Sequence, residues 1–477
     1  MNQPVVVKIK EKNGSVSLAT STDEAHYGVS KTTIFAVLAT IQAMLIFTIV
    51  MIGVPLPAIG KEFSLVQAQL VLVSAAYGLT FSGLLLFGGR LTDRYSGRTL
   101  FTWGILIFGL SSVAGFMAPD YWTLVAIRLA QGIGAACVAP ALMALLRQLY
   151  AEPEDFQRAM ATWGGVSVLG GAVGFLSSGI VTSWFSWRWM FSIPVLIAFL
   201  GLLLVRWMMP ALQHEIPQVK GLDRRGALLA TLGIACGSYG LIMSGEYPWI
   251  SVQVLVPFVT GVTLIAIFSK VEKCVASPLL PPGFIHQPTR MMGLAGILLA
   301  AAGMGLITLL LSLYLQQFRG WSSFSTSIAF VPYTLGLLVM NRAAGPLVMR
   351  FGALKVLIAG LLIGALGLVL LSQLTIETDY SVGLLPGLFI LPAGASLVFS
   401  ASAVLSTANV PMHQAGLAGG VMNTAMELGP TLGLAVLMSI AANRAELING
   451  YAWAFGSAAA FYMLAAVMAY ILRKRIQ

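Results

Sequence analysis

Fourteen apolar stretches follow one another along this chain of 477 residues, and each is long enough to cross a lipid bilayer. A helix needs about 20 mostly apolar residues to span the hydrocarbon core. The stretches are continuous rather than alternating, which excludes a membrane β-barrel. The sequence therefore predicts an all-α polytopic membrane protein with 14 transmembrane helices. Their expected limits are 33–55, 65–88, 98–117, 121–148, 158–182, 188–209, 226–246, 251–270, 290–317, 323–348, 353–374, 382–406, 414–441 and 452–472.

The composition excludes several other classes of protein. Hydrophobic residues make up 58% of the chain and charged residues only 9%, whereas soluble domains carry about 25% charged residues. So few charges cannot cover the surface of a soluble enzyme, a nucleic-acid-binding protein or a secreted domain. The net charge of +10 comes from short groups between apolar stretches, which is a topology signal and gives no reason to expect a nucleic-acid partner.

Positive charges fix the expected orientation, because loops rich in Lys and Arg stay in the cytoplasm. If the polar N-terminal segment is inside, 22 of the 27 basic residues fall in inside segments. One further residue, Arg128, lies within an apolar stretch. We therefore expect an inner (plasma) membrane protein with both termini in the cytoplasm. The four basic residues left outside are Lys61, Arg188, Arg319 and Arg444.

Two similar segments indicate an internal repeat. Gly89–Arg98 and Gly345–Lys355 share the pattern Gly-x-Leu-x-x-Arg-aromatic, and they lie eight helices apart. Two six-helix halves separated by two inserted helices account for that spacing, and parallel repeats are typical of transporters. The expected divisions are an N-terminal cytoplasmic tail (1–32), a six-helix bundle (33–209), two inserted helices with their inner loop (210–270), a cytoplasmic linker (271–289), a second six-helix bundle (290–472) and a basic cytoplasmic tail (473–477).

Six segments, in order along residues 31–472, carry a family resemblance. They are Gly89–Arg94, Arg128–Pro140, Trp187–Phe191, Asp223–Leu229, Tyr314–Gly320 and Ala415–Gly429. Together they resemble the major facilitator superfamily, in particular its fourteen-helix drug:proton antiporter (multidrug efflux) family. The resemblance implies two six-helix bundles of the major facilitator fold plus two inserted helices. It also implies proton-coupled export of amphipathic compounds by alternating access, a function associated with antibiotic resistance.

Two departures from the family pattern leave an alternative open. Ile46 stands where the family carries an acidic residue in its first helix, and Phe175 replaces the proline of the antiporter motif in the fifth. The glycines of that motif, Gly170, Gly174 and Gly179, are present. The alternative is a uniporter, or a more selective exporter of the same fold, that is not proton-coupled in the usual way.

Glu427 and Arg128 are the charged residues expected deep in the membrane. A charge at the bilayer centre costs about 2.5–3.5 kcal/mol or more, so such residues are usually functional. We expect Glu427 to bind and release a proton, unless it only hydrogen-bonds a neighbour in its neutral form. Arg128 keeps its charge. The resemblance links its position to proton coupling, and the alternative role is a structural tie to carbonyl groups of the first helix.

Further residues are candidates for the gate and for the substrate cavity. An ion pair or helix-end contact that forms in one state and breaks in the other biases alternating access. The expected gating residues are Asp93, Arg94, Gly89, Arg98 and Arg350. Polar and aromatic side chains on apolar helices suit loose recognition of varied ligands. The cavity candidates are Gln42, Tyr77, Gln131, Trp163, Ser312, Gln316, Tyr333 and Asn423.

Several chemistries are missing from the sequence. We find no Gly-Lys-Ser/Thr phosphate loop, so ATP is not expected to drive transport, and no His-Glu-x-x-His or Gly-x-Ser-x-Gly motif. Neither the cysteines (Cys137, Cys236, Cys274) nor the four dispersed histidines have metal-ligand spacing. The sequence therefore predicts no enzyme, cofactor or metal site. The expected partners are amphipathic small molecules, including cationic ones, together with protons and the lipid bilayer, and we expect a monomer.

Overall fold

The computed structural model describes residues 7–10, 16–19, 30–150, 152–208, 223–244, 246–275, 278–280, 283–408, 410, 415–442 and 446–476. Within these ranges the chain forms helices joined by turns and short connections, and the strands form one hairpin in the expected N-terminal tail. Its strands β1 (Val7–Lys10) and β2 (Val16–Ala19) pair antiparallel, with Val7 opposite Ala19.

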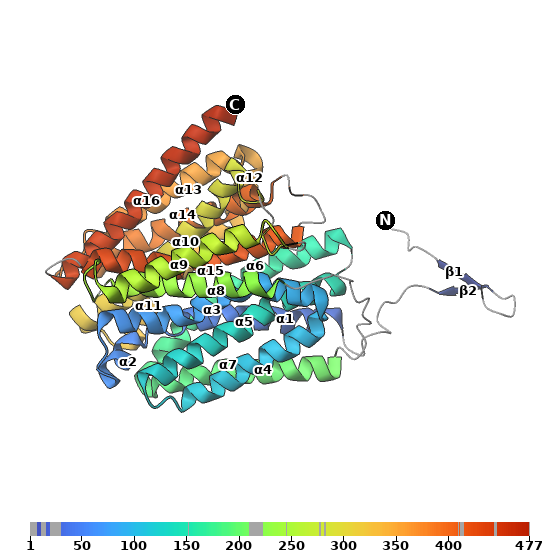
Figure 1. Ribbon diagram of the computed structural model, residues 1–477, viewed down its shortest axis with the longest axis horizontal. Helices are drawn as coiled ribbons and strands as arrows, with labels where there is room; N and C mark the ends of the chain where they lie inside the picture. The colour runs from blue at the N-terminus through green and yellow to red at the C-terminus, as the bar shows by residue number, and fades with distance from the viewer. Residues whose placement is uncertain are drawn as a thin grey trace.

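The helices fall into two sets of six with a pair inserted between them (Figure 1). The first set is α1 (Lys31–Val50), α3 (Gln67–Arg94), α4 (Gly97–Phe116), α5 (Tyr121–Leu149), α6 (Pro153–Trp184) and α7 (Ser192–Leu203), with the short α2 (Leu56–Glu62), η2 (Trp187–Phe191) and η3 (Leu204–Met208). The inserted pair is α8 (Arg224–Met243) and α9 (Val252–Val271). The second set is α10 (Pro288–Leu313), α12 (Val331–Phe351), α13 (Ala353–Leu371), α14 (Leu385–Thr407), α15 (Ala415–Ala442) and α16 (Leu447–Ile476), with the short η4 (Tyr314–Phe318), α11 (Ser323–Ala329) and η5 (Tyr380–Leu384).

The predicted number of membrane spans agrees with the structure. In the described part of the chain, 13 helices are long and apolar enough to cross a membrane, and the apolar stretch Leu169–Trp184 of α6 is a shorter one. Because α6 itself has 32 residues, its full length also suffices for a crossing. The predicted fold class is confirmed.

Local sequence explains where the helices begin and break. Side-chain oxygens of Ser96, Asp120 and Asp223 accept backbone N–H groups in the first turns of α4, α5 and α8. Pro332 stands in the first turn of α12, so the single expected stretch 323–348 is divided into α11 and α12. The Gly89 repeat, expected as a loop, instead forms the last turns of α3, which ends at Arg94.

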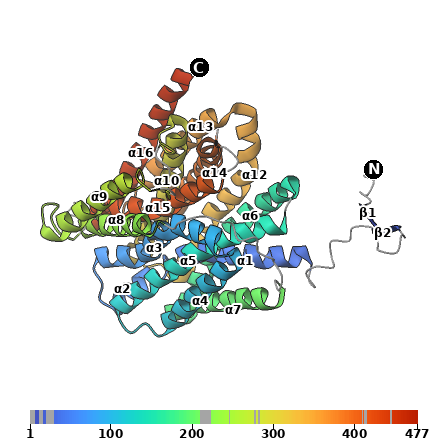
Figure 2. The same cartoon turned by 45° about the vertical axis from the view of Figure 1, so that its right-hand side comes forward.

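The two halves meet mainly along α3 and α6 of the first half. Helix α15 packs on α3, and α6 packs on α11 and α12. The inserted hairpin α8–α9 lies beside this interface, since α8 contacts both α3 and α15 (Figure 2). The inserted helices therefore touch both halves rather than forming a separate domain.

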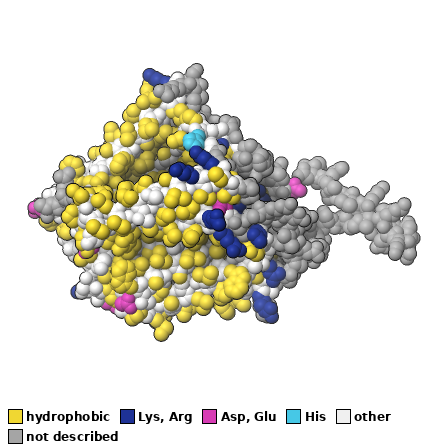
Figure 3. Space-filling view, viewed as in Figure 1, with side chains coloured by type: hydrophobic (Ala, Val, Ile, Leu, Met, Phe, Trp, Pro, Cys, Tyr) yellow, Lys and Arg dark blue, Asp and Glu magenta, His cyan; other side chains and the backbone are white. Residues whose placement is uncertain are grey.

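Charges separate to the two ends of the bundle, with an apolar surface between them. We call one end the basic end, where α3 ends at Arg94 and α8 begins at Arg224, and the opposite one the α2 end. Figure 3 shows an apolar surface over the middle of the molecule and most of the visible Lys and Arg side chains toward the right-hand side of the view. This distribution is that of a chain embedded in lipid.

The apolar cores differ between the two ends. At the α2 end, first-half residues such as Val50, Ile59 and Phe175 belong to one cluster with second-half residues such as Phe330 and Tyr333. Near the basic end, the first half has a cluster of its own, from Ile34 to Val205, with no second-half member in the described structure. The halves are therefore packed together at the α2 end.

Candidate functional site

Glu427 lies where the two halves touch, on the face of α15 that packs against α3. Its side chain is buried, with 4% exposed. A Cβ added to Gly78 of α3 would lie 2.6 Å from Thr431 Oγ1 and 3.7 Å from the Glu427 carbonyl oxygen. One added to Gly420 would lie 3.3 Å from Leu86 of α3. The two glycines thus let the buried polar residues of α15, Glu427 and Thr431, lie directly on α3.

Arg128 is completely buried in α5 and is held by the first half. Its NH1 group donates to the Thr48 carbonyl oxygen of α1 at 3.1 Å and to Gln131 Oε1 at 3.2 Å. Gln131 Nε2 in turn donates to Ser112 Oγ of α4 at 2.9 Å. The tie to a carbonyl of the first helix, one of the two alternatives for Arg128, is thus present in the structure.

Tyr77 connects the two buried charges. Its ring lies under the Arg128 guanidinium, with 5.1 Å from Cζ to the ring centroid, which is a cation–π contact. The next residue, Gly78, is where α3 touches Glu427 and Thr431 of α15. Helices α3, α5 and α15 therefore bring Tyr77, Arg128 and Glu427 into one polar cluster inside the apolar bundle.

Some buried polar atoms of the bundle, at Arg128 and at Ser312, have no protein partner in the described structure. Arg128 Nε and NH2 find no hydrogen-bond partner in the described structure, and neither does Ser312 Oγ of α10. An unsatisfied buried polar group costs about 1–3 kcal/mol, and more when it is charged. Such atoms mark places where water or a polar ligand group adds a hydrogen bond.

The remaining cavity candidates lie apart from this cluster. The ring centroids of Trp163 and Phe35 lie 6.3 Å apart, near the beginning of α1 at the basic end. Gln316 is at the α2 end, where its Nε2 donates to the Val54 carbonyl oxygen at 2.8 Å. Tyr333 is buried in the shared core. The structure thus unites Tyr77 and Gln131 with the buried charges, and Gln42 and Asn423 are half-buried on α1 and α15.

The gating candidates lie at the basic end. Arg98 donates to the Val205 carbonyl oxygen at 3.2 Å, which ties α4 to η3, the helical turn that follows α7. Arg94 and Arg350 are exposed beside Tyr95 and Phe351, and a Cβ on Gly89 would meet open space. Asp93 belongs to α3, but its side chain lies outside the described residues.

The predicted antiporter-motif glycines occupy close helix contacts. Gly170 and Gly174 of α6 face α1, at Ala43 and Phe47. Gly179 faces Ser327 of α11, in the second half. The motif therefore connects α6 to its own half through two glycines and to the other half through the third.

Phe175 supplies a contact that sequence reasoning missed. It stacks on Phe330 of the second half, with 4.4 Å between ring centroids and 11° between ring planes. Both rings are buried. The phenylalanine at the proline position of the motif thus forms an aromatic clasp between the halves at the α2 end.

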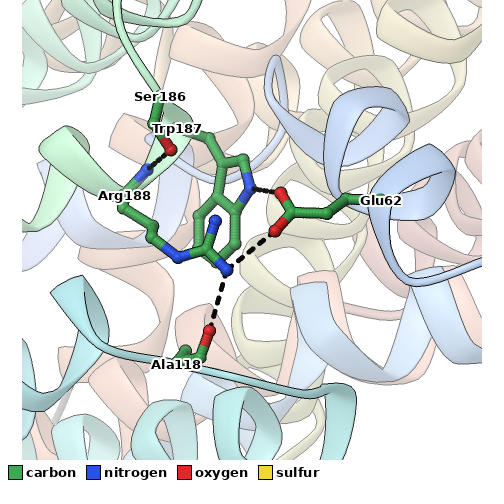
Figure 4. Close-up of polar contacts among 5 residues, drawn as sticks. All are labelled: Glu62, Ala118, Ser186, Trp187 and Arg188. Carbon is green, nitrogen blue, oxygen red and sulfur yellow. Dashed lines mark hydrogen bonds and ion pairs between the residues drawn. The ribbon is translucent and has the colours of Figure 1, made fainter.

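A second missed feature is a polar network within the first half at the same end (Figure 4). Glu62 Oε1 pairs with Arg188 NH2 at 2.8 Å, and Glu62 Oε2 accepts the Trp187 indole N–H at 2.7 Å. Arg188 NH2 also donates to the Ala118 carbonyl oxygen at 2.8 Å. Hydrogen bonds from Arg188 and Trp187 hold the pKa of Glu62 below its ordinary value.

Comparison with known proteins decides the family. The profile described as Major Facilitator Superfamily matches residues 36–281 and 293–477, which is most of the chain. The chain belongs to the major facilitator superfamily. The predicted resemblance is confirmed, and the paired halves described above are the two bundles of this superfamily.

Relatives of this superfamily member include antibiotic exporters and resistance proteins. The cephamycin export protein of Amycolatopsis lactamdurans is 34% identical over 465 residues, covering 96% of each chain. The puromycin resistance protein of Streptomyces alboniger is 33% identical over 455 residues, covering 91% of this chain and 90% of the relative. Among solved structures, a bacterial homologue of the human lysosomal transporter Spinster matches with a TM-score of 0.64 at 14% identity, covering 93% of this chain and 97% of the other. That likeness concerns the fold alone.

Proposed function

We propose that this protein is a secondary transporter that exports amphipathic small molecules, including cationic ones, in exchange for protons. The observation that carries the proposal is the position of Glu427, buried on α15 where it lies against α3 of the other half. The superfamily and the antibiotic-exporting relatives support the transport function. We further propose that the protein works as a monomer, within the domain boundaries predicted from the sequence.

The orientation follows from the distribution of charge. We propose that the basic end faces the cytoplasm, with both termini inside and the α2 end outside, in the inner (plasma) membrane. The halves are then closed on the outer side by the joined apolar core. An exporter must open this side to release its substrate, so the contacts at the α2 end have to break during each cycle.

Proton exchange at Glu427 gives the cycle its direction. A carboxylate in an apolar interface is costly, so the contact between α15 and α3 is more stable when Glu427 is protonated. When the halves separate, water reaches the carboxyl group and the proton leaves. The negative charge that remains, together with the Tyr77 ring, attracts a cationic or polarised amphipathic compound. Proton and substrate then alternate at one site.

Arg128 is held in place by the first half, so we give it a positioning role rather than that of the proton carrier. One of its nitrogens is engaged by Thr48 and Gln131, so the guanidinium stays with the first half. Its positive charge near Tyr77 supplies a fixed field for an incoming group. We propose that Arg128 positions the site and that Glu427 carries the proton.

A second candidate function has an observation in its favour. Ile46 occupies the acidic position of the family's first helix and lies next to α6, 3.8 Å from where a Cβ on Gly171 would stand. The first helix therefore offers no titratable group at this point. A uniporter, or a more selective exporter that does not use protons in the usual way, remains the alternative.

Transport into proteoliposomes under an imposed pH gradient distinguishes the two functions. The wild-type protein should move substrate in response to the gradient, with candidates chosen from a susceptibility panel in an exporter-deficient host. Glu427→Gln should abolish the response while keeping thermal stability. Glu246→Gln, an exposed carboxyl beyond the end of α8, is the matched control and should behave as wild type. Full gradient-driven transport by Glu427→Gln contradicts proton exchange at this residue, and pH-independent transport by the wild type supports the alternative.

A further inference from the structure

A second pair of buried carboxyl groups closes the base of the inserted hairpin, far along the chain from Glu427. Asp223 caps α8, where its Oδ1 accepts the Gly226 N–H at 2.7 Å. Glu272 follows the last residue of α9, and its Oε2 accepts the Leu280 N–H at 2.8 Å. Only 7% of Asp223 and 4% of Glu272 are exposed. One oxygen of each carboxyl group is thus satisfied by backbone.

The two remaining oxygens face each other. Asp223 Oδ2 and Glu272 Oε1 have no hydrogen-bond partner in the described structure. A methyl group on Gly226 would overlap Asp223 Oδ2 and would come within 2.7 Å of Glu272 Oε1. The two carboxyl groups are within hydrogen-bonding reach of each other. Two adjacent buried carboxylates repel, whereas one proton held between them satisfies both oxygens.

The surroundings of the pair are apolar on one side and positive on another. Ala227 and Phe268 of the hairpin, with Leu279, form a small core on which Phe87 of α3 packs. From α3, Arg90 donates to the Pro278 carbonyl oxygen at 2.6 Å, and its charge acts on Glu272. The other charged side chains next to the pair along the chain are exposed: Arg224, Arg225, Lys270 and Lys273.

We propose that Asp223 and Glu272 form a proton-binding site, separate from Glu427, in which one shared proton fastens the base of the α8–α9 hairpin. When that proton leaves to water, the second carboxylate is repelled by the first and attracted by Arg90. Glu272, after the end of α9, then moves away from Asp223 at the beginning of α8 and toward Arg90 near the end of α3. Because α3 also carries Tyr77, the site connects the pH at the basic end to the helix that contacts Glu427. The inference rests on the proposed function only for the side of the membrane that supplies the proton.

The pH range in which the site works follows from its burial. Glu272 lies outside the spanning segment Val252–Val271. Its pKa is raised from 4.5 to about 7, mainly by desolvation and further by Asp223, against the opposing effects of the Leu280 N–H and Arg90. Between these two values the folded protein binds the proton more strongly than the unfolded chain. The stabilisation by the shared proton is therefore full below pH 4.5 and is lost as the pH rises through about 7.

Hydrogen–deuterium exchange of the intact purified protein tests the site without measuring transport. The reporters are the backbone amides in the first turn of α8, where Asp223 accepts the Gly226 N–H. In the wild type, protection of this turn, corrected for the intrinsic pH dependence of exchange, should fall by up to about tenfold per pH unit above the midpoint, because the repelled carboxyl pair no longer holds α8. Glu272→Gln, which cannot lose a proton, should keep constant protection. Asp223→Asn retains the cap, removes the repulsion and should shift the fall to a different pH.

Each other outcome counts against the site. Equal pH profiles in the wild type and in Glu272→Gln overturn the proposal, and so does protection that is restored at high pH by millimolar calcium or sodium, because the ligand is then a metal cation. Glu246→Gln, an exposed carboxyl at the opposite end of α8, is the matched control and should retain the wild-type profile. Should the transport proposal fail while the exchange profile behaves as expected, the proton site stands by itself.

Discussion

The two ends of the bundle are held by different kinds of contact. At the α2 end, the halves share one apolar core, the clasp of Phe175 on Phe330, and the hydrogen bond from Gln316 to Val54. At the basic end, the polar contacts of Arg98 and Arg90 run to η3 and to the linker after α9 rather than between the halves. At the basic end the halves also touch, through a small cluster in which Leu86 of α3 packs on Ala418 and Val421 of α15, and the inserted hairpin bridges the halves beside it.

The difference between the two ends indicates which contacts must form and break during the transport cycle. Contacts within a half persist in every state, so they affect stability. Contacts between halves exist in one state only, so they affect the balance of states. Spin labels on Lys61→Cys and Ser322→Cys measure that balance, because both residues line a hollow of about 560 Å³ between the halves at the α2 end. The background carries serine in place of Cys137, Cys236 and Cys274.

Gly179→Ala should have the largest effect on the balance. A Cβ at this position would overlap the Ser327 side chain and lie 2.6 Å from the Ser323 carbonyl oxygen. Overpacking of this kind costs about 1–3 kcal/mol, which shifts the equilibrium by about fivefold to 150-fold toward separation at the α2 end. Pulsed dipolar distances between the two labels should lengthen, and transport should fall.

Gly171→Ala on the same helix is the control for that substitution. Its Cβ would stand 3.8 Å from Ile46, which is ordinary contact. The distance distribution of this variant should match the wild type. If Gly179→Ala also keeps the wild-type distribution, α6 and α11 do not form the closing contact.

Phe175→Leu should have a smaller effect in the same direction. Leucine keeps most of the apolar volume and removes the stack on Phe330, which is worth about 0.5–1.5 kcal/mol beyond area burial. The closed population should therefore fall by up to about tenfold. Leu176→Ala, at the neighbouring exposed position, should leave the label distances unchanged. The double variant Phe175→Leu/Phe330→Leu should destabilise the closed state by less than the sum of the two single variants. Strictly additive effects would contradict a contact between the two rings.

The clasp also shows how far the sequence could lead. The fourteen stretches, the inserted pair and the family followed from hydrophobicity, charge and motif order, because the bilayer imposes the length and the polarity of each helix. Glu427 and Arg128 were identifiable as buried because a charge within an apolar run is rare. From the sequence, however, Phe175 was recognisable only as a departure from a motif. Its partner lies 155 positions later, at Phe330, and no local pattern announces such a contact.

The other missed contacts have a similar cause. Trp163 and Gln316 had the polar and aromatic character of cavity residues, but their distance from the centre depends on how far along each helix the membrane middle falls. The Asp223–Glu272 pair was hidden because both residues lie at helix ends, where an acidic side chain normally reads as a cap or as a solvated charge. Only the folded hairpin turns their second oxygens toward each other.

Loss of the Glu62–Arg188 pair should have the smallest effect and should leave the balance of states unchanged, since every partner lies in the first half. The folded-state pKa of Glu62 is below its ordinary value of 4.5, so its contribution to stability is complete above pH 4.5 and is lost as the pH falls through the lowered pKa. Glu62→Gln keeps an acceptor for Trp187 and removes the charge. Because exposed ion pairs are worth about 0–1 kcal/mol, this variant should unfold at a slightly lower temperature than the wild type at pH 7, and the difference should vanish in acid. The label distances should be the same in both proteins at pH 7. A lengthened distance in Glu62→Gln would mean that this network closes the α2 end together with the contacts between the halves.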